Sequence, residues 1–266
     1  FGTQALTTHL RWPLYPSDFP GTFSAFTTST PSFAFESSSG RYIIFANRNP
    51  DDLFYLSMAD IVLGSVKDLD AAVSNPYGGT EYFDVLWSQS ENSAVISSTT
   101  DNAILYIQYV TGLNEPEAEI QSNGLYFSFP IDDGSQYLIT RVFDISDDGD
   151  KVLLWTWLDL PRTASQDYGD KYLLTARYDI SDSLVIDHLI VGNDTRAAAF
   201  SPYDESRLLI LNSQGLIELD TVTDTITAVE SASTLGNTGR GWFSPNADWL
   251  VFQGDGGLYG YHIPID

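Results

Sequence analysis

Short hydrophobic runs separated by polar clusters run through the whole chain. The runs are rich in β-branched and aromatic residues and are bounded by Gly, Asp, Asn and Ser, a pattern typical of strands joined by tight turns. Strands are predicted over residues 42–46, 94–97, 104–110, 152–158, 172–178, 208–211 and 249–253. Apolar residues fall at helical spacing in one stretch, residues 58–73, where we expect a short helix. The pattern predicts an all-β protein of the sandwich or propeller type.

A repeated unit discriminates between these two architectures. Five segments share an apolar or aromatic strand ending in Ser, then a short polar turn, then a strongly apolar strand. The aligned serines are separated by 51, 58, 55 and 43 residues, and such steps are the size of a propeller blade. The five serines are Ser37, Ser88, Ser146, Ser201 and Ser244.

Each repeat predicts a small antiparallel sheet. The strand before the Ser is the inner strand, and Ser-Pro or Asp-Gly reverses the chain into the next strand. Tight turns at Gln214-Gly215 and Gly256-Gly257 introduce a third strand. Residues 117–121 and 225–229 are expected to supply fourth, outer strands, so the blades are predicted to be four-stranded and antiparallel.

The turn, with its Phe-Ser-Pro and Asp-Asp-Gly elements, resembles the WD40-like repeats of the TolB type. Phe200-Ser201-Pro202 and Asp147-Asp148-Gly149 carry the resemblance, which covers about two thirds of the chain. In the first copy Ser38 and Ser39 replace the usual Pro and Asp, and Gln89 replaces the Pro in the second. The resemblance implies a β-propeller and has low functional specificity, because such repeats occur in partner-binding, gating and surface proteins alike.

The ends of the chain predict how the ring closes. The last repeat has three strands before the sequence reaches Asp266, so its outer strand is missing. Apolar and polar positions can alternate along residues 5–15, which are expected to supply that strand. Residues 16–31 are expected to form the linker to the first full blade. Residues 1–266 are thus expected to form a single propeller domain, with residues 1–31 as closing strand and linker and residues 32–266 as blades.

The number of blades depends on one segment. Residues 129–138 also resemble the repeat turn but begin only about 16 residues before Ser146, which leaves no room for a blade. The segment is either a hairpin inserted into a five-bladed ring, which we favour, or the start of a blade in a different register, which would give six.

The charge balance limits the partners. The chain has 36 acidic and 12 basic residues, and its formal net charge is −24. Phosphate backbones and anionic lipid surfaces would repel such a chain. We therefore expect no nucleic-acid partner and no insertion into a membrane. Proteins, a second copy of the chain, glycans and cations remain as partners.

Composition also bears on location. The chain has no cysteine, which excludes thiolate metal sites and Cys nucleophiles, and no apolar run long enough for a membrane-spanning helix. It begins at Phe1, as after removal of a leader, and contains the sequon Asn193-Asp194-Thr195. With its excess of Asp over Glu, the chain is expected to be secreted, displayed on the cell surface or periplasmic.

The densest acidic loop is the candidate metal site. Alternating carboxylates beside a glycine can wrap a hard cation, so Ca²⁺ is the expected ligand of Asp144, Asp147, Asp148 and Asp150. The loop lacks the spacing and terminal Glu of an EF-hand, and a solvated turn is the alternative. Asp132-Asp133-Gly134 is a weaker candidate of the same kind.

No catalytic motif is found in the sequence. The three histidines are isolated, and there is no G-x-S-x-G elbow and no P-loop. A glycoside hydrolase is the enzyme alternative, with Asp84 and Asp144 near inner strands as its acid and base. A lectin-like function is a further alternative, in which exposed rings stack on sugars; its candidates are Trp87, Trp157, Trp242 and Tyr259.

The sequence therefore favours a non-enzymatic extracellular propeller that acts as a binding or structural module. A detachable terminal strand would also permit self-assembly by strand donation between copies.

Overall fold

The computed structural model describes most of the chain beyond residue 32. The described residues are 33–48, 53–62, 65–74, 82–91, 93–99, 105–110, 128–131, 134–159, 170–179, 183–236, 238–244 and 247–264. The predicted closing strand at residues 5–15, the linker at 16–31 and the predicted outer strand at 117–121 lie outside them. The chain divides into two compact units, Phe1–Val85 and Leu86–Asp266, with the boundary inside strand β5 (Tyr82–Trp87).

The first unit contains one four-stranded antiparallel sheet. Its strands follow each other in sequence order: β1 (Phe33–Glu36), β2 (Tyr42–Arg48), β3 (Leu53–Asp60) and β4 (Ser65–Ser74). Ile43, Phe45 and Ala59 form its buried core. In this sheet Arg41 pairs with Asp60, at 3.0 Å between Nη2 and Oδ2.

The helix predicted for residues 58–73 is wrong. These residues lie instead in β3, the turn after it and β4, which pair as a hairpin with Ala59 opposite Val66. Asp60 stabilises the turn, because its Oδ1 accepts the N–H of Val62 at 2.9 Å. Pairing with the neighbouring strands β2 and β4 satisfies the backbone groups of β3, and this tertiary pairing overrides the apolar spacing.

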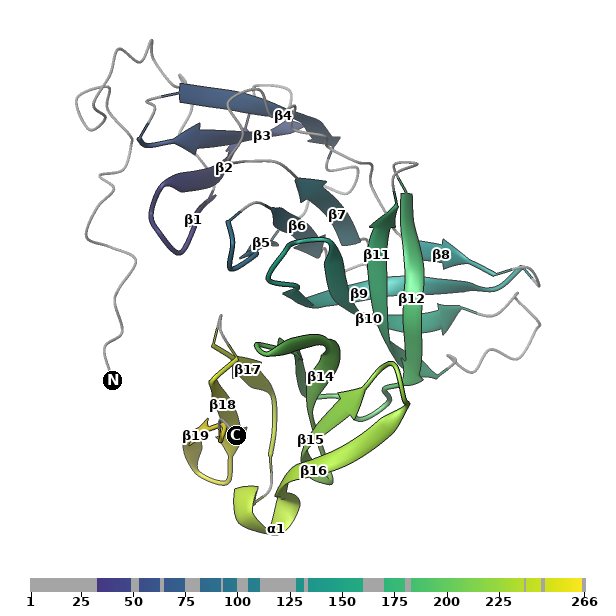
Figure 1. The fold of residues 1–266 in the computed structure, drawn as a ribbon. Coiled ribbons are helices and arrows are strands. Elements are labelled where there is room, and N and C mark those ends of the chain that lie inside the picture. Colours follow the sequence, from purple (N-terminus) through teal and green to yellow (C-terminus); the bar gives the residue numbers. More distant parts are fainter. Residues whose placement is uncertain are drawn as a thin grey trace. The chain divides into compact units, whose positions relative to one another are not determined.

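The remaining sheets follow, again in sequence order (Figure 1), and belong to the second unit except for residues 82–85 of β5. The first has β5, β6 (Ala94–Thr99) and β7 (Leu105–Val110), and the next has β8 (Ser128–Pro130), β9 (Gln136–Ile145), β10 (Lys151–Asp159), β11 (Lys171–Asp179) and β12 (Ser183–Val191). Then come β13 (Ala197–Ser201), β14 (Asp204–Asn212), β15 (Gly215–Asp220) and β16 (Thr225–Ser231). A short helix α1 (Ala232–Leu235) leads to β17 (Gly241–Phe243), β18 (Trp249–Gly254) and β19 (Gly257–His262).

The fold class is that of a β-propeller, as predicted. The sheets are small, antiparallel and consecutive, and the predicted outer strand at residues 225–229 is found as β16. The hairpin at residues 129–138 starts no sheet of its own: β8 pairs with the first half of β9 as a fifth strand. Five sheets are found among the described residues, and the number of blades in the whole chain stays a prediction.

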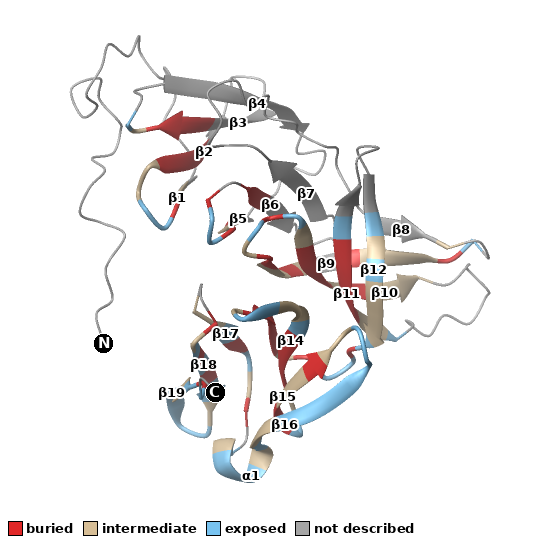
Figure 2. Ribbon diagram, viewed as in Figure 1, coloured by how far each residue is buried: buried red, intermediate tan, exposed pale blue. Residues whose placement is uncertain are grey.

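Adjacent sheets of the second unit pack through their apolar faces. Strand β13 contacts β9 of the preceding sheet and β17 of the following sheet. We call the contact between the β8–β12 and β13–β16 sheets the 9/13 interface, and the next one, between the β13–β16 and β17–β19 sheets, the 13/17 interface. Leu208 faces the first and Leu209 the second, because successive residues of a strand point to opposite faces. Figure 2 shows the buried residues concentrated in strands such as β13 and β14, whereas β16 is largely exposed.

The repeated serine forms the same turn in four of the five copies. At Ser37, Ser88, Ser146 and Ser244 the serine N–H donates to the carbonyl five residues on, and the serine hydroxyl accepts that residue's N–H at 2.9–3.2 Å. The residue three places on has a φ of 50–82° in all four, and it is Gly40, Glu91, Gly149 and Ala247 respectively. Glycine is favoured there because it has no Cβ to oppose a positive φ.

The fifth copy differs. Ser201 pairs directly with Asp204, so only Pro202 and Tyr203 remain in the turn and β14 starts earlier than the sequence predicts. The shorter turn extends the β13–β16 sheet at this end, where the candidate site lies.

Candidate functional site

A cavity of about 490 Å³ lies at the 13/17 interface. One wall comes from β14, β15 and β16, together with the short turn at Pro202 and Tyr203. The other wall comes from the residues before β18, Ala247 and Asp248, and from the residues after β19, Ile263 and Pro264. Its size is in the range of known ligand pockets, roughly 300–1,000 Å³.

Strand register brings the first wall together. Leu209, Glu218 and Thr227 are direct partners across β14, β15 and β16, so their side chains lie in one row on one face of the sheet. Leu209 is buried, Glu218 is half-buried and Thr227 is exposed, which gives the row an apolar inner end and a polar outer end. On the opposite wall, Ala247 and Ile263 are buried, and Ile263 N–H donates to the Asp248 carbonyl at 2.9 Å.

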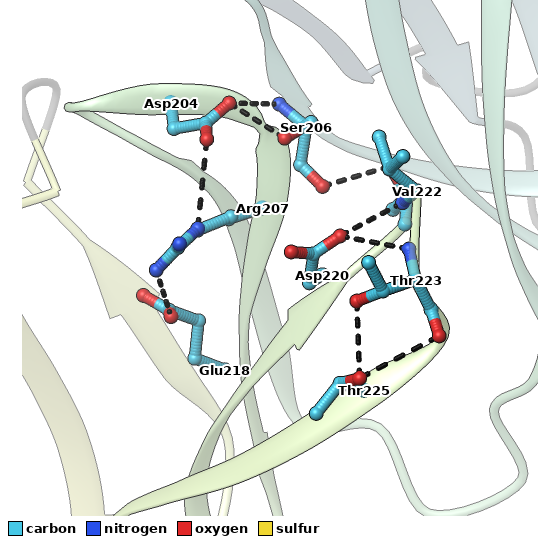
Figure 3. A network of polar contacts seen from close by, with 9 residues as sticks. Asp204, Ser206, Arg207, Glu218, Asp220, Val222, Thr223 and Thr225 are labelled. Atoms are coloured by element: carbon cyan, nitrogen blue, oxygen red, sulfur yellow. Dashed lines mark hydrogen bonds and ion pairs between the residues drawn. The ribbon is translucent and has the colours of Figure 1, made fainter.

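An arginine held between two carboxylates lies beside this row (Figure 3). Arg207 Nη1 donates to Glu218 Oε1 at 2.9 Å, and Arg207 Nε lies 3.5 Å from Asp204 Oδ2. The hydroxyl and N–H of Ser206 both donate to Asp204 Oδ1 and hold the pKa of Asp204 below its usual value. Asp204 is therefore ionised at neutral pH. With Asp248 included, the cavity lining contains three carboxylates and one guanidinium.

Asp220 bonds to backbone groups of the turn between β15 and β16, and the residues of this turn do not line the cavity. Asp220 Oδ1 accepts the N–H groups of Val222 and Thr223 at 2.9 and 3.0 Å, and the bond from Thr223 lowers the pKa of Asp220 (Figure 3). Thr221 is fixed to the neighbouring strand, since its N–H and hydroxyl both donate to the Ser206 carbonyl at 2.7 Å.

The predicted calcium loop uses several of its carboxylate oxygens within the fold. Asp148 Oδ1 accepts from Ser146 Oγ at 2.7 Å and from Asp150 N–H at 3.1 Å. Burial raises the pKa values of Asp147 and Asp150. Within the described part of the chain, no group of three or more Asp, Glu, His or Cys side chains is arranged to hold a metal ion. Calcium binding by Asp144, Asp147, Asp148 and Asp150 stays a prediction.

Asp144 has a different role from the rest of that loop. It lies on β9, and its Oδ2 accepts the N–H of Phe200 on β13 at 2.8 Å, across the 9/13 interface. Its Oδ1 accepts the N–H of Ile145 at 2.9 Å. Burial raises its pKa to about 7, the two N–H donors oppose the shift, and the nearby charge of Asp147 adds to it. Asp144 thus connects two sheets and does not line the cavity.

The remaining predicted residues are not brought together where the structure describes them. His9, Asp132 and Asp133 lie outside the described residues, as does the side chain of Asp84. His188 approaches Asp224, at 3.4 Å between Nε2 and Oδ1, whereas His262 packs edge-on against Trp249 on another sheet.

The aromatic candidates are also dispersed. Trp157 is on β10 with the Lys171 ammonium 5.3 Å from its ring centre. Trp242 and Tyr259 are exposed on the β17–β19 sheet but lie opposite Val251 and Phe252, which are adjacent residues with side chains on opposite faces. Of the residues that line the cavity, Tyr203 alone is aromatic.

The sequence prediction missed the cavity residues. Asp204, Arg207 and Glu218 carry no motif, and their proximity depends on the register of β14 and β15. The one available signal was the Ser201-Pro202 copy of the repeat, in which charged residues immediately follow the turn.

Comparison with known proteins gives matches among solved structures. No protein-family model and no curated protein matches the sequence. Among solved structures, TolB from Acinetobacter baumannii is 13% identical with a TM-score of 0.45, over 85% of this chain and 51% of TolB. The WD40 domain of Neurospora crassa Pan2 is 10% identical with a TM-score of 0.46, over 92% of this chain and 66% of that domain. The tricorn protease is 11% identical with a TM-score of 0.38, over 88% of this chain and 29% of the protease.

The small, consecutive antiparallel sheets of the structure agree with the resemblance to TolB-type and WD40-like propellers that the sequence predicts. The chain spans about half the length of TolB. In the part of the chain that the structure describes, no helix has both the length and the apolar character needed to cross a membrane.

Proposed function

We propose that the chain is a non-enzymatic binding module that engages protein partners outside the cytoplasm. The cavity at the 13/17 interface carries this proposal, because it combines a ligand-sized volume with an apolar floor and a few charged groups. The exposed Tyr203 at its edge is the kind of side chain that anchors protein contacts.

The charges in the cavity favour binding over glycoside hydrolysis. A glycosidase needs one carboxylic acid with a raised pKa close to a second carboxylate. In the cavity lining Asp204 has a lowered pKa, and both Asp204 and Glu218 are bound to Arg207. Asp144 does have a raised pKa, but it accepts two backbone N–H groups and lies outside the cavity.

Photo-crosslinking tests the proposal directly. A benzophenone amino acid placed at Tyr203 in the full chain should capture a discrete protein from the native source. The same group at Val185, which is exposed on β12 in another sheet, is the matched control. A product that forms at position 203 and not at position 185 supports the proposal. No product at 203, or the same products at both positions, contradicts it.

Self-association is a second candidate, favoured by the last sheet. β19 pairs with β18 on one side only among the described strands, and its residues Leu258 and Tyr259 are exposed. An open strand edge of this kind accepts a strand from another copy. Deleting residues 1–15 should convert an oligomer to a monomer in light scattering, if that segment is the donated strand. A full-length chain that is already monomeric contradicts this candidate.

A further inference from the structure

We propose that the cavity at the 13/17 interface receives a lysine or arginine side chain from an extended segment of a protein partner. This inference rests on the proposed function and adds to it the chemistry of the partner.

The shape of the cavity suits a long side chain with an apolar stem. Leu209 on one wall and Ala247 and Ile263 on the other are buried, and the half-buried Val229 adds to this apolar surface. The methylene groups of lysine or arginine pack on such a surface while the charged head stays near polar groups. A short polar side chain would leave this apolar surface uncovered.

The charge of the cavity selects a cation. Asp204, Glu218 and Asp248 outnumber the single Arg207, so the lining keeps an excess of negative charge after Arg207 is paired. Arg207 is engaged on two sides, by Glu218 through Nη1 and by Asp204 through Nε, which leaves it poorly placed to attract an anion. The net charge of −24 adds a long-range attraction for a basic partner.

A protein segment fits the surroundings better than a free small cation. Thr227, Ala228 and Val229 of β16 line the cavity, and β16 pairs with β15 alone among the described strands. The exposed edge of such a strand can pair with an extended backbone, which would present alternate side chains to the cavity.

Binding of defined peptides to the full chain tests the charge selection. The probes are fluorescein-labelled pentapeptides with leucine and valine flanking a central lysine, norleucine or glutamate, and binding is read by fluorescence anisotropy. The lysine peptide should bind about tenfold more tightly than the norleucine peptide and should weaken as salt is added. Equal affinities for lysine and norleucine, tighter binding of glutamate, or no binding of any peptide overturns the inference.

Two variants that should change the lysine-peptide affinity in opposite directions distinguish an effect of charge from structural damage. E218Q removes one negative charge yet keeps an oxygen for Arg207, and it should weaken lysine-peptide binding about three- to tenfold. R207Q removes the competing cation and should strengthen binding by a similar factor. D187N, at an exposed position on β12, removes an equal charge elsewhere and should change binding less than twofold. If E218Q and R207Q both weaken binding, or if neither variant changes the affinity, the cavity does not select by charge.

The crosslink at Tyr203 keeps this inference distinct from the proposed function. If a partner crosslinks at position 203 and its capture is unaffected by E218Q, the protein is a binding module but the cavity does not take a basic side chain. If no partner crosslinks, the binding function itself fails.

Discussion

The two faces of the β13–β16 sheet are built from the same repeat but have opposite properties. The 9/13 interface is filled by aliphatic side chains and Phe200 and is crossed by polar contacts: Asp144 with Phe200, Asp148 N–H with Glu205, and His188 with Asp224. The 13/17 interface has an apolar core too, but it opens into a cavity lined by charged residues. The repeat thus determines the sheets, whereas the side chains that the strands and turns present differ between one interface and the next.

The turns that meet the β13–β16 sheet on its two sides have the same length but present different side chains. At the 9/13 interface the turn after Ser146 is long enough for the Asp148 N–H to reach Glu205 of the next sheet at 3.2 Å. At the 13/17 interface the corresponding turn after Ser244 presents the small Ala247 to the cavity. Less side-chain volume remains to fill the space between the walls.

The largest expected effect comes from truncating the two faces of β14 separately. Leu208 and Leu209 are consecutive and buried, but Leu208 packs at the 9/13 interface and Leu209 borders the cavity. L208A should lower the free energy of unfolding by about 3–5 kcal/mol and L209A by about 2–3 kcal/mol, since the latter enlarges an existing cavity. Urea unfolding of both variants measures the difference. Equal losses, or a greater loss for L209A, would mean that the two interfaces are equally well packed.

A glycine substitution tests how tightly the turns of neighbouring sheets pack. A Cβ on Gly149 would lie 2.4 Å from Ser93 Cβ, and the residue has a φ of +82°. G149A should cost about 2–4 kcal/mol, from the strained φ and the contact with Ser93 together. Gly256 has a similar φ of +92° and open space around it, so G256A should cost only about 1–2 kcal/mol. Urea midpoints that fall equally for both variants would refute tight packing at Gly149.

The polar contacts at the 9/13 interface predict a dependence of stability on pH. Because burial raises the pKa of Asp144 to about 7, the folded chain binds a proton that the unfolded chain releases near pH 4. The contribution of Asp144 to stability should therefore fall as pH rises from about 4 to about 7, by at most about 1.4 kcal/mol per pH unit. It should be constant above that range.

The variant D144N isolates this contribution. The difference in unfolding free energy between the natural chain and D144N should be more favourable to the natural chain at pH 5 than at pH 8. D187N, at an exposed position on β12, is the matched control. If the difference for D144N is the same at both pH values, Asp144 does not titrate in this range.

The smallest expected effect is that of chelation. Several carboxylate oxygens of the Asp144–Asp150 segment already accept hydrogen bonds from the protein, so EDTA should leave the melting temperature unchanged. A fall of several degrees on adding EDTA, reversed by Ca²⁺, would instead establish the calcium site that the sequence predicts.

The sequence predicted the fold better than the site. Polar turns around a repeated Ser and β-rich runs are local signals, and they sufficed for the strand pattern and the propeller class. The helix expected at residues 58–73 was wrong because strand pairing outweighs the spacing of a few apolar residues. The cavity could not be predicted, because Arg207 and Glu218 are neighbours only through the register of β14 and β15.

The hydrogen bonds of the serine-centred turn determine which of its positions can be exchanged, by evolution or by design. Its closure uses main-chain groups and the serine hydroxyl, and that hydroxyl also bonds to a polar side chain of the turn, which is Ser90, Asp148 or Asp248 depending on the copy. Gln89-Ser90 and Asp147-Asp148 occupy equivalent places with different chemistry. A foreign dipeptide should therefore keep the shape of the turn when its second residue can bond to the serine hydroxyl, which leaves the first residue free to vary.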